Sequence, residues 1–353
     1  MASVLVTSTQ PAADSAGTQI RENPDVTARV ALAAAVCREQ AGGHSRVRYH
    51  RGLPRAERPM NTSAIRVGVV RESLHGLVPW LQLAKPGVTR LVVLTTLFGW
   101  IVAPGSGDLV RCLLTVLGTT LVVVAANAMN MVLEVDADAL MTRTRLRPLP
   151  TGRIEPAHAQ RAAYVAALVG VGMLALIDYT TALLALLALA SYVWVYTPLK
   201  RITPYALYVG AVPGAIPPVM GYASATGGHL DLTALVLFGI LFVWQVPHFI
   251  AIALFRSEEY ARAGFKVFGA PGTEKQARRL LLGWSLVLFF GSLLPVVWGV
   301  AGTLYLALAL GFGTMFVAGS AYGLSAAADR AWARSLFFAS MPYLIVLLVG
   351  LAI

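Results

Sequence analysis

The residues best suited to chemistry lie in one stretch of the sequence, between Asn127 and Pro148. Asn130, Glu134 and Asp138 recur at four-residue spacing, so on a helix they would form a single ridge. An acid in the bilayer costs about 2.5–3.5 kcal/mol on insertion scales, and such residues usually face a pathway or a site. The spacing therefore predicts a site at the end of an apolar helix. Asp136 lies between the two acids and is expected to point elsewhere, toward the mouth of that helix.

A divalent cation is the expected occupant of this ridge. Carboxylates four residues apart on a helix repel each other, so a positive charge should lie between them. Carboxylate and amide oxygens suit Mg²⁺, which prefers hard oxygen ligands and commonly bridges to the phosphates of a substrate. We therefore predict Mg²⁺ as the cofactor, with Asn130, Glu134 and Asp138 as its ligands.

Three arginines, Arg143, Arg145 and Arg147, follow the acids directly. A guanidinium presents a fork of donors that matches two phosphate oxygens. Acids for a metal and arginines for phosphate, at one membrane interface, indicate an amphiphilic diphosphate as substrate. The alternative is that the arginines only hold a loop in the cytoplasm and that the acids neutralise them.

A second basic group could complete the site. Tyr196 is followed by the adjacent cations Lys200 and Arg201, which could grip a phosphate or a carboxylate. An ordinary topology anchor is an equally good interpretation of this pair alone.

A third polar group lies inside an apolar segment. Gln245 and His248 flank Pro247, and Glu259 and Tyr260 follow at the end of the same segment. His248 is either a ligand-binding residue or a packed histidine that only forms a hydrogen bond.

The composition shows what must position these residues. Of 353 residues, 57% are hydrophobic and 13% are charged, with a mean hydropathy of +0.68. A soluble domain needs roughly 25% charged residues, so lipid must solvate much of this chain. The net charge of +11 is not a nucleic-acid footprint, because most basic residues beyond the amino-terminal region lie in short gaps between apolar segments. Cys37 and Cys112 lie far apart outside any cysteine motif, which argues against a disulfide framework or a structural zinc site.

A spanning helix needs about 20 apolar residues, and the sequence offers nine candidates. The predicted fold is thus all-α, a polytopic bundle of nine transmembrane helices. The fifth segment contains three prolines and should be kinked. The nine candidates are 87–104, 109–132, 160–177, 180–197, 205–223, 232–254, 280–299, 302–322 and 335–353.

The connections after the second, fourth, sixth and eighth segments carry nearly all the loop lysines and arginines. This asymmetry predicts that the amino terminus and every polar loop lie in the cytoplasm. Residues 1–75 are rich in alanine, arginine, serine and threonine and predict a disordered cytoplasmic arm before a membrane domain at 76–353. A cleavable organelle-targeting peptide is the alternative for the arm.

Five motifs in this order resemble the UbiA superfamily of membrane prenyltransferases, and within it the branch that farnesylates haem. The resemblance covers about residues 75–350. It rests on Asn130-xxx-Glu134-x-Asp136-x-Asp138-xx-Met141-x-Arg143-Thr144-xx-Arg147-Pro148, Tyr196-Thr197-xx-Lys200-Arg201, Pro213-Gly214-Ala215-Ile216-Pro217-Pro218, Trp244-Gln245-x-Pro247-His248-Phe249 and Glu259-Tyr260-xx-Ala263-Gly264.

The resemblance implies a lipid-open cavity capped by cytoplasmic loops, in which farnesyl diphosphate reacts with a vinyl group of haem B to give haem O for terminal oxidases. It also implies a bacterial inner membrane, or the mitochondrial inner membrane in a eukaryote, with haem A synthase or oxidase assembly factors as candidate partners. Catalytic roles then fall on Asn130, Glu134, Asp138, Arg143, Arg147 and His248. Substrate binding falls on Asp136, Tyr196, Lys200, Arg201, Gln245 and Tyr260.

Two departures from the family pattern affect these expectations. Glu134 stands where many members have aspartate, which keeps the charge on a longer arm. The stretch 265–271 replaces a Pro-Met-Leu-Pro-Val-Val type sequence and bears on the choice of acceptor. The alternatives are therefore a UbiA-type enzyme with a quinone-ring or tetrapyrrole precursor as acceptor, a transporter, or a non-catalytic haem carrier.

Overall fold

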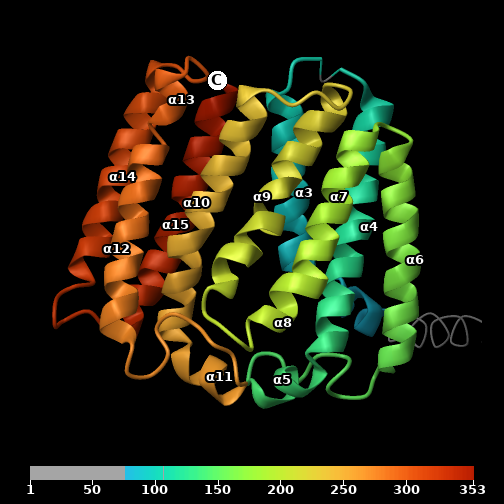
Figure 1. The fold of residues 1–353 in the computed structure, drawn as a ribbon, viewed down its shortest axis with the longest axis horizontal. Coiled ribbons are helices and arrows are strands. Elements are labelled where there is room, and N and C mark those ends of the chain that lie inside the picture. The colour runs from blue at the N-terminus through green and yellow to red at the C-terminus, as the bar shows by residue number, and fades with distance from the viewer. Residues whose placement is uncertain (1–75, 106) are drawn as a thin grey trace, which may run out of the picture. The chain divides into compact units, whose positions relative to one another are not determined.

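The computed structural model describes residues 76–105 and 107–353, so the predicted arm lies outside the described residues. Regular structure in the described part is helical (Figure 1), and the helices carry the labels of that figure. The long helices are α3 (Pro86–Val102), α4 (Leu109–Leu133), α6 (Pro156–Ala175), α7 (Tyr179–Ala190), α9 (Ala206–Ala225), α10 (Leu232–Phe255), α12 (Glu274–Gly291), α14 (Thr303–Tyr322) and α15 (Arg330–Ala352). The short ones are a helix at Gly76–Leu83, α5 (Val135–Leu140), the π-helix η1 (Ser191–Tyr196), α8 (Thr197–Leu199), α11 (Ser257–Arg262) and α13 (Leu294–Val297).

The predicted apolar segments coincide with long helices, so the all-α membrane bundle is confirmed. Within the described residues, six helices are long and apolar enough to cross a bilayer. A seventh is added if Gly76–Leu83 and α3, which meet at an angle of 51°, count as one broken span. The predicted number of nine is therefore not confirmed, because α6 and α9, each 20 residues long, are not apolar enough to meet the same criteria.

Aspartates start four of the long helices by capping free backbone N–H groups. Asp108 accepts from Arg111 at 3.1 Å and Asp178 accepts from Thr181 at 2.7 Å. Asp231 and Asp329 cap α10 and α15 in the same way. A carboxylate also favours the positive end of the helix dipole.

Helices α3 and α9 pack against each other through glycines. A Cβ on Gly99 would lie 1.8 Å from the carbonyl oxygen of Pro218, and one on Gly221 would lie 1.9 Å from that of Thr96. Only glycine permits this approach, which is typical of helix pairs that associate within a membrane.

Helix α9 contains Pro213, Pro217 and Pro218, and each proline removes a backbone donor. The carbonyl of Ala211 in the same helix accepts a hydrogen bond of 3.2 Å from Nε2 of Gln245 on α10. This side-chain donor ties α9 to α10 beside the first proline of the helix.

One end of the bundle carries the charged connections and is called the polar end here. It comprises the segments 134–155, 197–205, 256–273 and 323–329, with α5, α8 and α11 among them (Figure 1). The opposite end carries α13 and the carboxyl terminus. The basic loops predicted to share one side of the membrane are thus gathered at one end of the bundle.

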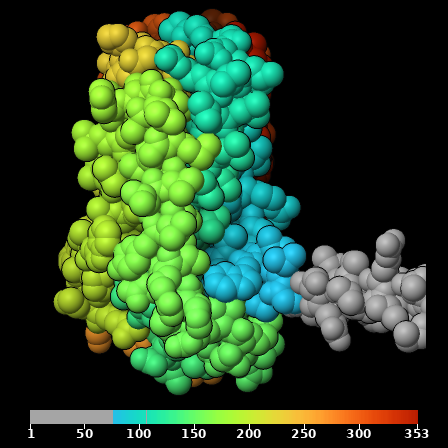
Figure 2. All heavy atoms as spheres, turned by 90° about the vertical axis from the view of Figure 1, so that its right-hand side faces the viewer, coloured from blue at the N-terminus to red at the C-terminus, as the bar shows by residue number. Residues whose placement is uncertain are grey.

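The flanks of the bundle are apolar. Figure 2 views it from the side on which α6 lies, and large side chains such as Val165, Leu168 and Leu183 are exposed on α6 and α7. Exposed aliphatic groups of this size on the flank of a membrane bundle are suited to lipid. The chain is a multi-pass membrane protein.

Candidate active site

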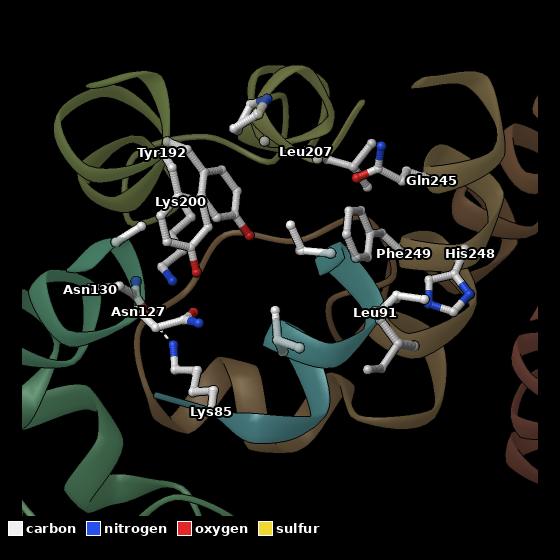
Figure 3. Close-up of a pocket in the computed structure, with 18 of the residues that line it drawn as sticks. Lys85, Leu91, Asn127, Asn130, Tyr192, Lys200, Leu207, Gln245, His248 and Phe249 are labelled. Carbon is white, nitrogen blue, oxygen red and sulfur yellow. Dashed lines mark hydrogen bonds between the residues drawn. The ribbon is translucent and has the colours of Figure 1, made fainter. Parts of the chain in front are cut away.

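A cavity of about 650 Å³ opens between the helices at the polar end and extends into the bundle. Its outer part is lined by acids and cations, and its inner part by aliphatic and aromatic side chains (Figure 3). A pocket of this size with a few convergent polar groups has the form of a small-molecule site. Its charged lining consists of Lys85, Glu134, Asp138, Arg143, Arg147, Lys200 and Lys266.

The predicted ridge lines this cavity. Asn130, Glu134 and Asp138 are buried, at 3%, 4% and 1% exposure. Helix α4 ends at Leu133 and α5 begins at Val135, so the ridge bends at Glu134. The backbone N–H of Asp138 still donates to the carbonyl of Glu134 at 2.8 Å, which keeps helical spacing across the bend.

Each acid of the ridge is paired with its own cation. Nη1 of Arg147 donates to both carboxylate oxygens of Asp138, at 2.8 and 2.7 Å. The ammonium of Lys200 forms an ion pair with Oε1 of Glu134. Nδ2 of Asn130 donates to the other oxygen of Glu134 at 3.0 Å. The positive charge expected between the acids is thus supplied in part by residues of the chain.

Lys85 is a member of this cluster that the sequence analysis missed. Its ammonium donates to Oδ1 of Asn130 at 2.6 Å and lines the cavity (Figure 3). Lys85 has a φ of 45°, the left-handed region, and is the only described non-glycine residue there. Strained backbone of this kind is concentrated at functional sites. A lone lysine at the mouth of the first apolar segment, followed by the helix-starting Pro86, was the available signal.

Arg143 reaches the cavity from a loop held by Glu259. Oε1 of Glu259 accepts from the backbone N–H of Arg143 at 3.1 Å, and Oε2 accepts from Arg256 at 2.9 Å. Partial burial acts to raise the pKa of Glu259, but these two donors outweigh it and leave that pKa below its ordinary value. Glu259 therefore stays ionised at neutral pH and links the α5 loop to α11.

Aromatic rings surround the cations. Tyr192 and Tyr196 belong to the π-helix η1, and π-helical turns are frequent at functional sites. The ammonium of Lys200 lies 5.2 Å from the ring centre of Tyr196 and 4.9 Å from that of Phe265, within cation–π range. Tyr260, predicted to bind substrate, also lines the cavity, and so does Tyr192, which was not predicted.

The stretch 265–271, whose sequence departs from the family pattern and is called the departing loop here, forms part of the cavity wall. Phe265, Lys266, Val267 and Phe268 line the cavity, and the backbone N–H of Lys266 donates to the carbonyl of Lys200 at 2.8 Å. The stretch whose sequence differs from the family pattern therefore contacts the space available to substrates.

Gln245 and His248 lie on α10 and line the cavity together (Figure 3). Both are buried, at 6% and 7% exposure. Gln245 donates to carbonyls of α9 and α10. In Figure 3, His248 lies on the opposite side of the cavity from Asn130, the labelled member of the ridge.

Asp136 and Arg201 do not line the cavity. Both are exposed at the polar end, and Arg201 makes one long hydrogen bond, 3.5 Å, to the carbonyl of Leu133. Their placement gives no support to the predicted substrate-binding roles. Asp136 points away from the ridge, as its two-residue offset from Glu134 indicated.

The oxygen atoms of Asn130, Glu134 and Asp138 suit a Mg²⁺ ion that is shared with a substrate. In the described part of the chain, no three His, Cys, Asp or Glu side chains gather into a metal cluster. The ridge offers two carboxylates and one amide oxygen, all facing the cavity. Mg²⁺ is usually held by one or two carboxylates together with substrate phosphates, so this set suits an ion that arrives with a diphosphate.

Known proteins with similar sequences carry names that describe an action on haem. The chain is 45% identical to protoheme IX farnesyltransferase of Anaeromyxobacter dehalogenans over 293 residues, which cover 83% of this chain and 99% of that protein. It is 46% identical to protoheme IX farnesyltransferase of Sorangium cellulosum over 241 residues, 68% of this chain and 86% of that protein.

Solved structures agree on the fold. A structure of digeranylgeranylglyceryl phosphate synthase superposes with a TM-score of 0.67 at 17% identity, covering 79% of this chain and 99% of that one. A UbiA homologue from Archaeoglobus fulgidus bound to DMAPP and Mg²⁺ superposes with a TM-score of 0.58 at 15% identity, covering 78% and 99%. The UbiA prenyltransferase family matches residues 92–341. The chain therefore belongs to the UbiA prenyltransferase family.

Proposed function

We propose that this protein transfers the farnesyl group of farnesyl diphosphate to a vinyl group of haem B and so forms haem O. The observation that carries the proposal is the placement of two buried carboxylates among five cations at the mouth of an apolar cavity. The names of its relatives at 45–46% identity support haem as the acceptor.

The part of the cavity that lies at the polar end of the bundle would bind the diphosphate. Glu134, Asp138 and the amide oxygen of Asn130 would hold Mg²⁺, and the ion would neutralise phosphate charge and orient the leaving group. Lys200 and Arg147, now paired with the two acids, would then be free to contact phosphate oxygens. The Mg²⁺-containing homologue from Archaeoglobus fulgidus supports this use of the fold.

Arg143, Arg147 and Lys200 would stabilise the leaving diphosphate. The allylic C–O bond breaks with its electron pair going to the diphosphate oxygen, so negative charge grows where the cations lie. Fixed charges at the point where charge develops are usually the largest catalytic term.

The inner part of the cavity would protect the farnesyl cation. Leu91, Leu189, Leu207 and Leu241 are among its aliphatic lining residues and exclude water from the reacting carbon. The vinyl π electrons of haem form the new C–C bond. Water then adds to the resulting cation and loses a proton, which leaves a hydroxyethylfarnesyl group.

We propose further that the amino terminus and the polar end face the cytoplasm, in a bacterial inner membrane. The gathering of the basic connections at one end of the bundle supports this orientation. The product would serve the assembly of terminal oxidases.

A different acceptor is the second candidate, because Phe265, Lys266, Val267 and Phe268 of the departing loop line the cavity. Membranes containing the protein would be supplied with Mg²⁺, farnesyl diphosphate and haem B, and their pigments analysed by mass spectrometry. Farnesylated haem supports the proposal, and its absence beside another prenylated product points to the second candidate. Bound but unmodified haem would contradict an enzymatic role.

A further inference from the structure

His248 is held by a residue that the mechanism above does not use. Its ring nitrogen Nδ1 lies 2.7 Å from Oγ of Ser340, which is 92 residues away on α15. Ser340 is fully buried. Its carbonyl accepts a hydrogen bond of 2.6 Å from Nε1 of Trp244, one turn before His248 on α10. Ser340 thus links two residues of one helical face to α15.

The direction of the His248 bond follows from the hydroxyl of Ser340. A serine hydroxyl has a single proton. That proton is donated to the carbonyl of Phe337 at 2.6 Å. Oγ of Ser340 must therefore accept from His248, so Nδ1 carries the hydrogen and Nε2 has a free lone pair.

The other side of the ring is turned to the cavity. His248 lines the cavity, and no residue in the described part of the chain forms a hydrogen bond with Nε2. His158 and His229, the other described histidines, do not line it. His248 is thus the only described histidine that offers an imidazole nitrogen to a bound ligand.

Aromatic packing fixes the plane of the ring. The ring centre of His248 lies 4.6 Å from that of Trp244 and 4.4 Å from that of Phe337, with interplanar angles of 26° and 31°. An imidazole whose tautomer and plane are both set has the arrangement found in metal-binding histidines, which donate their second ring N–H to an outer partner.

We propose that Ser340 is a positioning residue that holds His248 in the Nδ1–H tautomer, so that Nε2 binds the iron of the haem substrate. The inference rests on the proposed function, because it takes haem as the acceptor. The Fe–N bond would place the macrocycle against α10 and α15, with its edge toward the charged end of the cavity. Iron remains in the same oxidation state, and no covalent bond of the haem changes in this step.

The test measures haem binding without farnesyl diphosphate. Purified protein in lipid nanodiscs is titrated with haem B, and the ferrous complex is examined by resonance Raman spectroscopy for an iron–histidine stretching band. The wild type should show the band. His248→Ala should lose it, and added imidazole should restore nitrogen ligation.

Ser340→Ala should weaken haem affinity about tenfold and shift or weaken the band, since loss of such an outer partner typically costs 10–100-fold. Ser340→Thr keeps the hydroxyl and should retain the wild-type spectrum. Ser320→Ala is the matched control, because Ser320 is a fully buried serine that donates to the carbonyl of Phe316 but forms no hydrogen bond with His248.

The inference is overturned if the wild type binds haem without the band, if His248→Ala keeps it, or if Ser340→Ala matches the wild type. Product analysis separates this result from the proposed function. Farnesylated haem from a protein whose spectrum ignores His248 leaves the function standing and removes the ligand role. Histidine-ligated haem that is never farnesylated leaves the ligand role standing and removes the proposed function. A protein that binds no haem at all removes both the ligand role and the proposed function.

Discussion

The ammonium of Lys85 donates a 2.6 Å hydrogen bond to Oδ1 of Asn130, across 45 residues of sequence. The same asparagine donates to Glu134, whose carboxylate also pairs with Lys200. One amide therefore connects two lysines and an acid at the mouth of the cavity. In this arrangement the amino-terminal edge of α3 takes part in the site formed by α4 and α5.

Lys85→Met should raise the KM for farnesyl diphosphate about tenfold or more, because a hydrogen bond to a charged group is worth about 1.5–3 kcal/mol. Steady-state kinetics in nanodiscs would measure the change. Arg90→Met is the matched control, since Arg90 is exposed on the same helix and does not line the cavity. An unchanged KM in Lys85→Met would exclude a role for this ammonium in substrate binding.

Arg147→Met should lower the free energy of unfolding by about 3 kcal/mol, since it leaves the buried carboxylate of Asp138 without its partner. The double variant Asp138→Leu/Arg147→Met removes both charges and should regain most of that stability. It should nevertheless stay inactive. Thermal unfolding in detergent and product formation would be measured in parallel. Recovery of activity together with stability would show that the pair has only a structural role.

Glu259→Gln should reduce turnover about tenfold at neutral pH, because the loop that carries Arg143 loses an ionised acceptor. The pKa of Glu259 is lowered in the folded protein. The stability that its ionised carboxylate gives to the folded state is therefore complete above the ordinary glutamate pKa of about 4.3, and it is lost as the pH falls through the lowered value. Turnover is compared at pH 7 with that of Glu274→Gln, since the carboxylate of Glu274 accepts from the exposed N–H of Gly272 and does not hold the loop that carries Arg143. Equal rates in the two variants would contradict the role of Glu259.

Gly99→Ala should destabilise the bundle strongly, because its Cβ would overlap the carbonyl of Pro218 on α9. Gly239→Ala is the control, as a Cβ there meets nothing within 4 Å. That substitution should be neutral or stabilising by up to about 1 kcal/mol, the helix-propensity gain over glycine. Thermal unfolding would measure the melting temperatures of the two variants. Similar melting temperatures would contradict close packing of α3 on α9.

The site residues that one helical element brings together could be predicted from the sequence. Asn130, Glu134 and Asp138 share a helical ridge, and helical periodicity also indicated that Asp136 points elsewhere. The all-α membrane fold followed from composition. The number of spans did not, because proline, glycine and polar residues within helices such as α9 make the apolar signal ambiguous.

The site residues that could not be predicted from the sequence depend on packing between distant segments. Lys85 joins the site because the chain turns sharply before α3, where this lysine adopts a positive φ. Ser340 meets His248 only because α15 packs on α10. Arg201 was predicted with Lys200 because adjacent basic residues look equivalent in a sequence, yet the helical turn at α8 places only Lys200 at the cavity.

The central claim is that the acids and cations at the polar end bind farnesyl diphosphate together with Mg²⁺. The most direct measurement is calorimetric titration of a non-hydrolysable farnesyl diphosphate analogue into the nanodisc-embedded protein, with Mg²⁺ and with EDTA. The account predicts that Mg²⁺ tightens binding at least tenfold in the wild type and not in Asp138→Asn. Equal dependence on Mg²⁺ in both proteins would contradict it.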